Sequence, residues 1–187
     1  MSPSSVFSTL SSSFSSSSIL DDSAASAEAC LLVREVDGQY RPARAEEVLL
    51  QAQRVLAQQI RAGAPMDSPQ VVRRYLQVAI GTLEHEVFDV LFLDAQMRVI
   101  ALKEMFRGSV TQTAVYPREV VKEALALNAA GVILAHNHPS GSTAPSRSDE
   151  MLTQALKAAL SLVEVKVLDH LIVTAGGITS FAEQGLL

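Results

Sequence analysis

Cysteine and long apolar runs are both scarce in this chain. Cys30 is the only cysteine among 187 residues, so no disulfide can form within the chain. No run of eighteen or more apolar residues occurs, and the sequence therefore predicts no transmembrane helix. We also see no basic leader followed by an apolar stretch, so we expect a cytoplasmic protein that does not associate with membranes.

Positive charge is scarce too. The chain carries 15 Lys or Arg against 20 Asp or Glu, a formal net charge of -5, and residues 67–187 carry 10 against 13. Domains that bind nucleic acid usually present a basic patch that replaces phosphate counterions. The charge balance does not support a nucleic-acid partner, since Arg73 and Arg74 form a pair and not a stripe.

The N-terminal part is predicted to lie outside the main domain. Residues 1–29 form a serine-rich, low-complexity tail with few large apolar side chains, which we expect to be disordered because it cannot offset its ordering entropy. Residues 30–66 are predicted as a helical extension and linker, with an amphipathic helix from Ala43 to Ala62. This helix could pack on its own domain or on a second chain, so the oligomeric state stays open.

The main domain is predicted over residues 67–187. The chain is 48% hydrophobic and 19% charged, which is enough apolar content for a real core. Periodicity predicts alternating helices and strands, and hence an α/β (or α+β) fold. The expected elements are a helix from Pro69, strands over 87–93, 99–102 and 110–115, a helix from Pro117 that Gly131 ends, a strand over 131–135, a helix over 151–163, a strand over 165–173 and a short last strand.

Two histidines directly follow the apolar strand over 131–135. Side chains two residues apart in a strand point the same way, so His136 and His138 face one side together while Asn137 faces the other. Asp149 follows His138 across a loop with two prolines and a glycine, long enough to fold back over the strand end. Two imidazoles and one carboxylate are typical of a catalytic zinc site, which keeps its fourth position for water.

The same residues also fit a simpler interpretation. Ser146 and Asp149 precede an amphipathic run, and this spacing is typical of a helix start with Ser146 as the N-cap and Asp149 near the positive end of the helix dipole. A histidine after a strand is also more often a core or surface residue than a ligand. The joint pattern is more specific than its parts, and at this point both interpretations of Asp149 stay open.

The spacing of these residues resembles a known family. His136-x-His138, seven residues, Ser146, two residues and Asp149 resemble the JAMM (MPN+/JAB) metalloprotease motif, and His-Asn-His-Pro-Ser-Gly resembles the RadC branch of that family. The likeness covers about 120 residues, from Asp67 to the end. It includes Glu86-Val-Phe, Leu91-Phe-Leu-Asp94, Phe106-Arg-Gly108, Val115-Tyr-Pro-Arg-Glu119, Leu168-Asp-His170 and Ser180-Phe-Ala-Glu-Gln-Gly185.

The resemblance implies a fold and a cofactor. The fold is a mixed, curved sheet flanked by helices, a JAB/MPN fold similar to that of cytidine deaminases. The cofactor is Zn²⁺, held by His136, His138 and Asp149. The single cysteine excludes the Cys-x-x-Cys ligand pair of a zinc deaminase itself.

The resemblance also implies catalytic roles. In JAMM enzymes an upstream glutamate acts as general base, and Glu86 occupies that place, at the junction of the first main-domain helix with the following strand. Glu84 and Glu104 are rivals that spacing does not exclude. Ser146 would stabilise the oxyanion as an electrostatic helper, since no histidine is assigned to activate it as a nucleophile. His170 either fixes the orientation of a ligand or is an ordinary core histidine.

Two functions follow as expectations. The first is a zinc-dependent peptidase or isopeptidase that cleaves an unidentified amide in a peptide or protein substrate. The second is an accessory protein of DNA repair, recombination or mobile elements, in which the fold serves mainly for binding. Longer members of the RadC family carry an N-terminal helix-hairpin-helix-like region associated with DNA. We find no glycine-bearing hairpin pair here, which weakens the second expectation.

Overall fold

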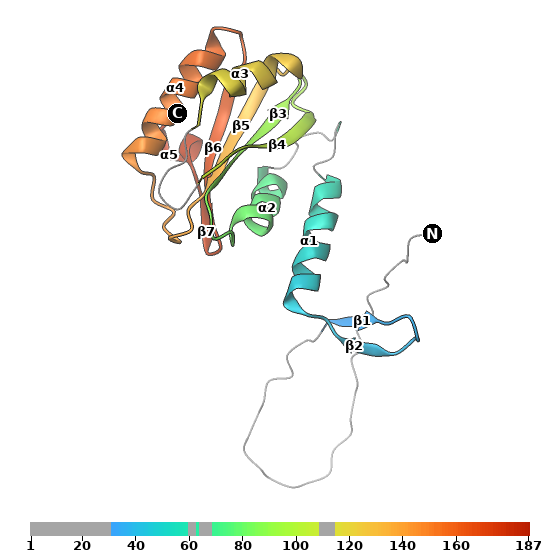
Figure 1. Ribbon diagram of the computed structural model, residues 1–187. Coiled ribbons are helices and arrows are strands. Elements are labelled where there is room, and N and C mark those ends of the chain that lie inside the picture. The colour runs from blue at the N-terminus through green and yellow to red at the C-terminus, as the bar shows by residue number, and fades with distance from the viewer. Residues whose placement is uncertain (1–30, 60–62, 64–68, 109–114) are drawn as a thin grey trace. The chain divides into compact units, whose positions relative to one another are not determined.

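A computed structural model describes residues 31–59, 63, 69–108 and 115–187 (Figure 1). The predicted serine-rich tail lies outside the described residues. The chain divides into two compact units, Met1–Gln51 and Ala52–Leu187, and each is described by itself. No helix among the described residues combines the length and the apolar character needed to cross a bilayer.

The first unit contains a short antiparallel hairpin of β1 (Leu32–Arg34) and β2 (Tyr40–Pro42). The sequence did not predict this hairpin because strands of three residues are too short to show an alternating pattern. The helix α1 (Ala45–Gln59) begins in the first unit and ends in the second. It confirms most of the predicted helix, but it starts at Ala45 and not at Ala43, and residues 60–62 lie outside the described residues.

The second unit is built on a five-stranded sheet with strand order β4-β3-β5-β6-β7. Strands β5 and β6 are parallel and all other neighbours are antiparallel, so the sheet is mixed. The predicted class, a mixed sheet flanked by helices, is confirmed. The elements are α2 (Pro69–Ile80), β3 (Val87–Leu93), β4 (Val99–Arg107), α3 (Pro117–Ala126), β5 (Gly131–Asn137), α4 (Arg147–Ser161), β6 (Lys166–Thr174), β7 (Gly177–Ser180) and α5 (Phe181–Gln184).

Helices cover both faces of this sheet, α2 on one face and α3 with α4 on the other (Figure 1). Every residue of β3 is buried, as expected for a strand with apolar helices on both sides. Its side chains alternate between the two faces. Val87, Leu91 and Leu93 belong to the core cluster that contains the apolar residues of α2, and Phe88, Val90 and Phe92 belong to the cluster that contains those of α3 and α4.

Several predicted boundaries differ from the structure; the end of β5, both ends of β6 and the end of α4 differ by only one or two residues. Helix α3 ends at Ala126, and Gly131 is the first residue of β5 and not the end of the helix. Asn128 ends the helix instead, with a left-handed φ of 51°. The backbone N–H groups of Asn128 and Ala129 donate to the carbonyls of Leu125 and Ala124, which is a Schellman motif.

The other larger differences concern the end of β4, the start of α4 and one predicted strand. Strand β4 continues to Arg107 and not only to residue 102, and α4 begins at Arg147 and not at Met151, because Ser146 caps it. The strand predicted over 110–115 falls outside the described residues except for Val115, which is in no strand.

Candidate metal site

The histidines His136 and His138 lie where β5 ends. As predicted from the strand spacing, their rings lie together, with their ring centroids 4.8 Å apart. His136 is 2% exposed and its ring stacks on Phe88 of the neighbouring strand β3. The His138 side chain is 17% exposed, so the cluster has a buried side and a side open to solvent.

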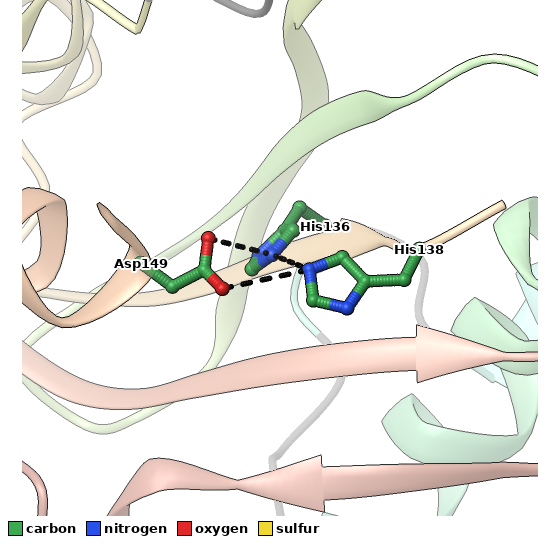
Figure 2. Close-up of side chains that lie close together, drawn as sticks. All are labelled: His136, His138 and Asp149. Carbon is green, nitrogen blue, oxygen red and sulfur yellow. Dashed lines mark hydrogen bonds and ion pairs between the residues drawn. The ribbon is translucent and has the colours of Figure 1, made fainter. Parts of the chain in front are cut away.

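The first turn of α4 brings Asp149 to both imidazoles (Figure 2). Nε2 of His136 lies 2.9 Å from Nε2 of His138. Oδ1 of Asp149 lies 3.3 Å from Nε2 of His136, and Oδ2 lies 3.5 Å from Nε2 of His138. Two ligands of a tetrahedral zinc ion at its usual bond lengths are about 3.4 Å apart. One atom from each of the three residues lies within 4.8 Å of the others, a set that could hold a metal ion.

Asp149 also completes a capping box, so its cap and its contact with the two histidines occur in one geometry. The backbone N–H of Asp149 donates to Oγ of Ser146 at 3.2 Å, and the backbone N–H of Ser146 donates to Oδ2 of Asp149 at 2.8 Å. The cap fixes the carboxylate at the position from which it reaches the histidines. Ser146, the predicted helper, thus lies beside the cluster as the N-cap of α4.

The electrostatics of the cluster favour positive charge. Burial opposes ionisation of Asp149, but its contacts with His136 and His138 and its hydrogen bond with Ser146 outweigh burial and lower the pKa of Asp149 well below the usual range. The hydrogen bond with Asp149 in turn raises the pKa of His138, against the opposing effect of burial. An ionised carboxylate beside two imidazoles therefore attracts a proton or a metal cation.

The loop after β5 fixes the tautomer of His138. Nδ1 of His138 lies 2.8 Å from the carbonyl oxygen of Ser142, and a carbonyl can only accept. Nδ1 therefore carries the hydrogen, and in the neutral ring the lone pair is on Nε2, which faces Asp149. Gly141, with φ of 79°, provides the turn that brings Ser142 back to the ring.

Of the three candidate bases, Glu86 and Glu104 lie on different faces of the sheet. Glu86 directly precedes β3, and its charge contributes to the raised pKa of His138. Glu104 is the cross-strand neighbour of Asp89, lines a cavity with Tyr75 of α2, and forms two hydrogen bonds with Arg107. Glu104 is thus on the α2 face, away from His136. Glu84 is exposed in the segment before Glu86.

Asn137 has a positional role that the sequence pattern did not reveal. Its fully buried side chain faces away from the histidines and accepts a hydrogen bond from the backbone N–H of Val87 at 2.7 Å. Its amide group donates to the carbonyls of Leu83 and His85 at 3.3 and 3.0 Å. Asn137 therefore ties the segment that carries Glu86 to β5. The sequence offered one sign of this role, because an asparagine in an apolar strand is expected to be buried, and a buried amide must find hydrogen-bond partners.

His170 of β6 lies behind the cluster and is fully buried. Its Nε2 is 2.8 Å from Nδ1 of His136. Burial lowers the pKa of His170 to about 3, so its ring is neutral at physiological pH. The residue is a core histidine and at the same time contacts His136, so the two interpretations offered by the sequence do not exclude each other.

The fold and this cluster together define a JAB/MPN-type domain: a mixed sheet between helices, a His-x-His strand end, and an aspartate in the first turn of the next helix. The chain belongs to the RadC-like JAB domain family, whose model matches residues 66–186. The predicted family is thereby confirmed.

Bacterial relatives carry the name UPF0758 protein. The chain is 57% identical to the one from Leptothrix cholodnii over 150 residues, which cover 80% of this chain and 68% of the relative. It is 58% identical to the one from Polaromonas sp. over 150 residues, 80% of this chain and 67% of the relative. The match to the relative from Variovorax paradoxus is 54% over 162 residues, 87% of this chain and 72% of the relative.

Proposed function

We propose that this chain is a zinc-dependent metallohydrolase of the peptidase or isopeptidase class, in which His136, His138 and Asp149 hold the ion. The observation that carries the proposal is the convergence of two imidazole nitrogens and a carboxylate at the separations given above. Nitrogen and carboxylate oxygen are ligands that zinc accepts, and three protein ligands leave a position open.

When bound, zinc would act as a Lewis acid and lower the pKa of a water molecule toward about 7. In this proposal Glu86 takes the proton that the attacking water loses and passes it to the leaving amine. Ser146 uses Oγ as an acceptor in the capping box, which leaves its hydroxyl hydrogen able to donate to the oxyanion that develops on the substrate carbonyl.

The exposed side of the cluster indicates how a substrate reaches it. The side chains of His138 and Asp149 are 17% and 13% exposed, whereas His136 is buried behind them. An amide of a peptide or protein therefore approaches over His138 and Asp149.

Metal analysis of the purified protein tests the first part of the proposal. The wild type should carry about one equivalent of zinc per chain, and His136→Ala should lose it. A wild type that binds no zinc, even when zinc is supplied, would remove the basis of the hydrolase.

A peptide-substrate screen tests the second part with a matched pair of variants. Glu86→Gln should keep zinc and lose most turnover, because a neutral amide cannot accept the proton. Glu104→Gln changes a glutamate on the other face of the sheet and should keep both zinc and turnover. Equal turnover in Glu86→Gln and wild type would reassign the base.

The accessory DNA role remains the alternative, and DNA binding tests it. At a net charge of -5 we expect no measurable affinity at low salt. An affinity that falls steeply as salt is added would favour the alternative.

A further inference from the structure

Three linked hydrogen bonds, two of them buried and one partly buried, connect two of the clustered residues through the core. Nδ1 of His136 lies 2.8 Å from Nε2 of His170. On the other side of the ring, Nδ1 of His170 lies 2.6 Å from Oγ1 of Thr153. The Thr153 hydroxyl donates to the backbone carbonyl of Asp149 at 2.6 Å. This series of hydrogen bonds thus starts at the His136 ring and ends at the backbone carbonyl of Asp149.

The Asp149 carbonyl, at one end of this series of hydrogen bonds, sets the donor and the acceptor in each of them. The Asp149 carbonyl can only accept, so the hydroxyl hydrogen of Thr153 points to it. Oγ1 of Thr153 must then accept from Nδ1–H of His170. A neutral imidazole carries one hydrogen, so Nε2 of His170 has the lone pair and accepts from Nδ1–H of His136. The lone pair of His136 is consequently on Nε2, inside the cluster.

The surroundings hold the ring of His170 in the orientation that this series of hydrogen bonds requires. The ring meets Phe88 edge-on, with centroids 5.6 Å apart, and lies 4.7 Å from the ring of Phe181. Its backbone is fixed as well, because the Asp169 carboxylate accepts hydrogen bonds from the N–H of His170 at 2.7 Å and from the hydroxyl of Ser180 at 2.6 Å. The ring therefore has little freedom to turn away.

We propose that Thr153 and His170 are positioning residues that lock His136 in its Nδ1–H tautomer and so present an unprotonated Nε2 to the metal. The opposite tautomer would place a hydrogen where the ion is to bind. Partners of this kind around metal-binding histidines typically change metal affinity by a factor of about 10 to 100. The effect on affinity rests on the proposed function above, but the tautomer itself does not.

Nitrogen-15 NMR of the metal-free protein tests the tautomer directly. At a pH high enough to remove the extra proton from the cluster of His136, His138 and Asp149, His136 should show a protonated Nδ1 and an unprotonated Nε2. Thr153→Val removes the hydroxyl at nearly constant shape and should give a mixture of tautomers, whereas Thr153→Ser keeps the hydroxyl and should behave as wild type. Thermal unfolding of each variant checks that the fold is intact.

Zinc affinity, measured by competition with a chelator, is the second readout. Thr153→Val should bind zinc at least about tenfold more weakly than Thr153→Ser. Zinc binding with an unchanged tautomer and affinity in Thr153→Val would overturn the positioning role and leave the metal site standing. The Nδ1–H tautomer in a protein that binds no zinc would support the hydrogen-bond chain and overturn the metal site instead.

Discussion

Asn137 and Val87 are joined by a hydrogen bond of 2.7 Å, in which the backbone N–H of Val87 donates to Oδ1 of Asn137. Asn137 lies between the two histidines in the sequence, and Val87 directly follows Glu86. The bond therefore links the strand end that carries the imidazoles to the segment that carries the proposed base. Both residues are buried, so water cannot reach these groups, and loss of the bond would leave them without a partner.

Asn137→Ala should lower the free energy of unfolding by about 3 kcal/mol, because it leaves a buried N–H and two carbonyls without their partner. Urea unfolding measures this effect. Gln154→Ala is a control, since it removes an exposed amide that donates to the carbonyl of Leu186 at 3.2 Å, and it should cost less than about 0.5 kcal/mol. Equal losses in the two variants would contradict the anchoring role of Asn137.

The two roles of Asp149 can be separated by substitution. Asp149→Asn keeps an oxygen for the cap but removes the negative charge, so zinc affinity should fall strongly. Ser146→Ala should instead lower stability by about 1 kcal/mol through loss of the cap. Chelator competition and urea unfolding on both variants distinguish these effects. A fully retained zinc affinity in Asp149→Asn would exclude its carboxylate as a ligand.

Asp89 should make the protein less stable as the pH rises from about 4 to 6. The residue is 7% exposed and its Oδ1 has no hydrogen-bond partner among the described residues. Burial, with a smaller contribution from the charge of Glu104, raises the pKa of Asp89 to about 6. The folded state thus holds this proton over a range where the unfolded state, with a pKa near 3.9, has released it. The ionised carboxylate then destabilises the fold at neutral pH.

Asp89→Asn should therefore raise the free energy of unfolding at pH 7.5 by about 1 to 3 kcal/mol and leave it nearly unchanged at pH 4. Urea unfolding at both pH values measures the difference. Asp94→Asn is a control in which the free energy of unfolding at pH 7.5 should fall and not rise. Backbone hydrogen bonds, chiefly from Arg98, lower the pKa of Asp94, so its ionised form stabilises the fold. A gain at pH 4 as large as that at pH 7.5 would show that ionisation is not the cause.

Gly81 follows α2 at a close approach between backbones. A Cβ atom at this position would lie 2.5 Å from the carbonyl oxygen of Gln77 and 2.9 Å from that of Thr174. Gly81→Ala should therefore cost about 1 to 3 kcal/mol in thermal or urea unfolding, since backbone must move to admit the methyl group. A Cβ atom added at Gly176 would have its nearest neighbour, Oγ1 of Thr174, 4.0 Å away, so Gly176→Ala should be close to neutral.

Much of the fold could be predicted because the periodicity of the apolar residues is strong. Strand β3 agrees with its predicted range, and α2 begins at the predicted Pro69. Local signals failed where a turn was made by an unexpected residue, as with Asn128 at the end of α3. They failed again for β1 and β2, whose three residues each are too few for a pattern.

The common direction of the two histidine side chains was determined by the sequence itself, because residues two apart in a strand share a face. The capping role of Ser146 was also local, since its partner lies only three residues ahead. Only the tertiary structure decided that Asp149, Thr153 and His170 gather around His136. They come from α4 and β6, and these elements meet β5 because they bury their apolar faces together. Spacing suggested Asp149 as a partner but left its role open, and it gave no sign of Thr153.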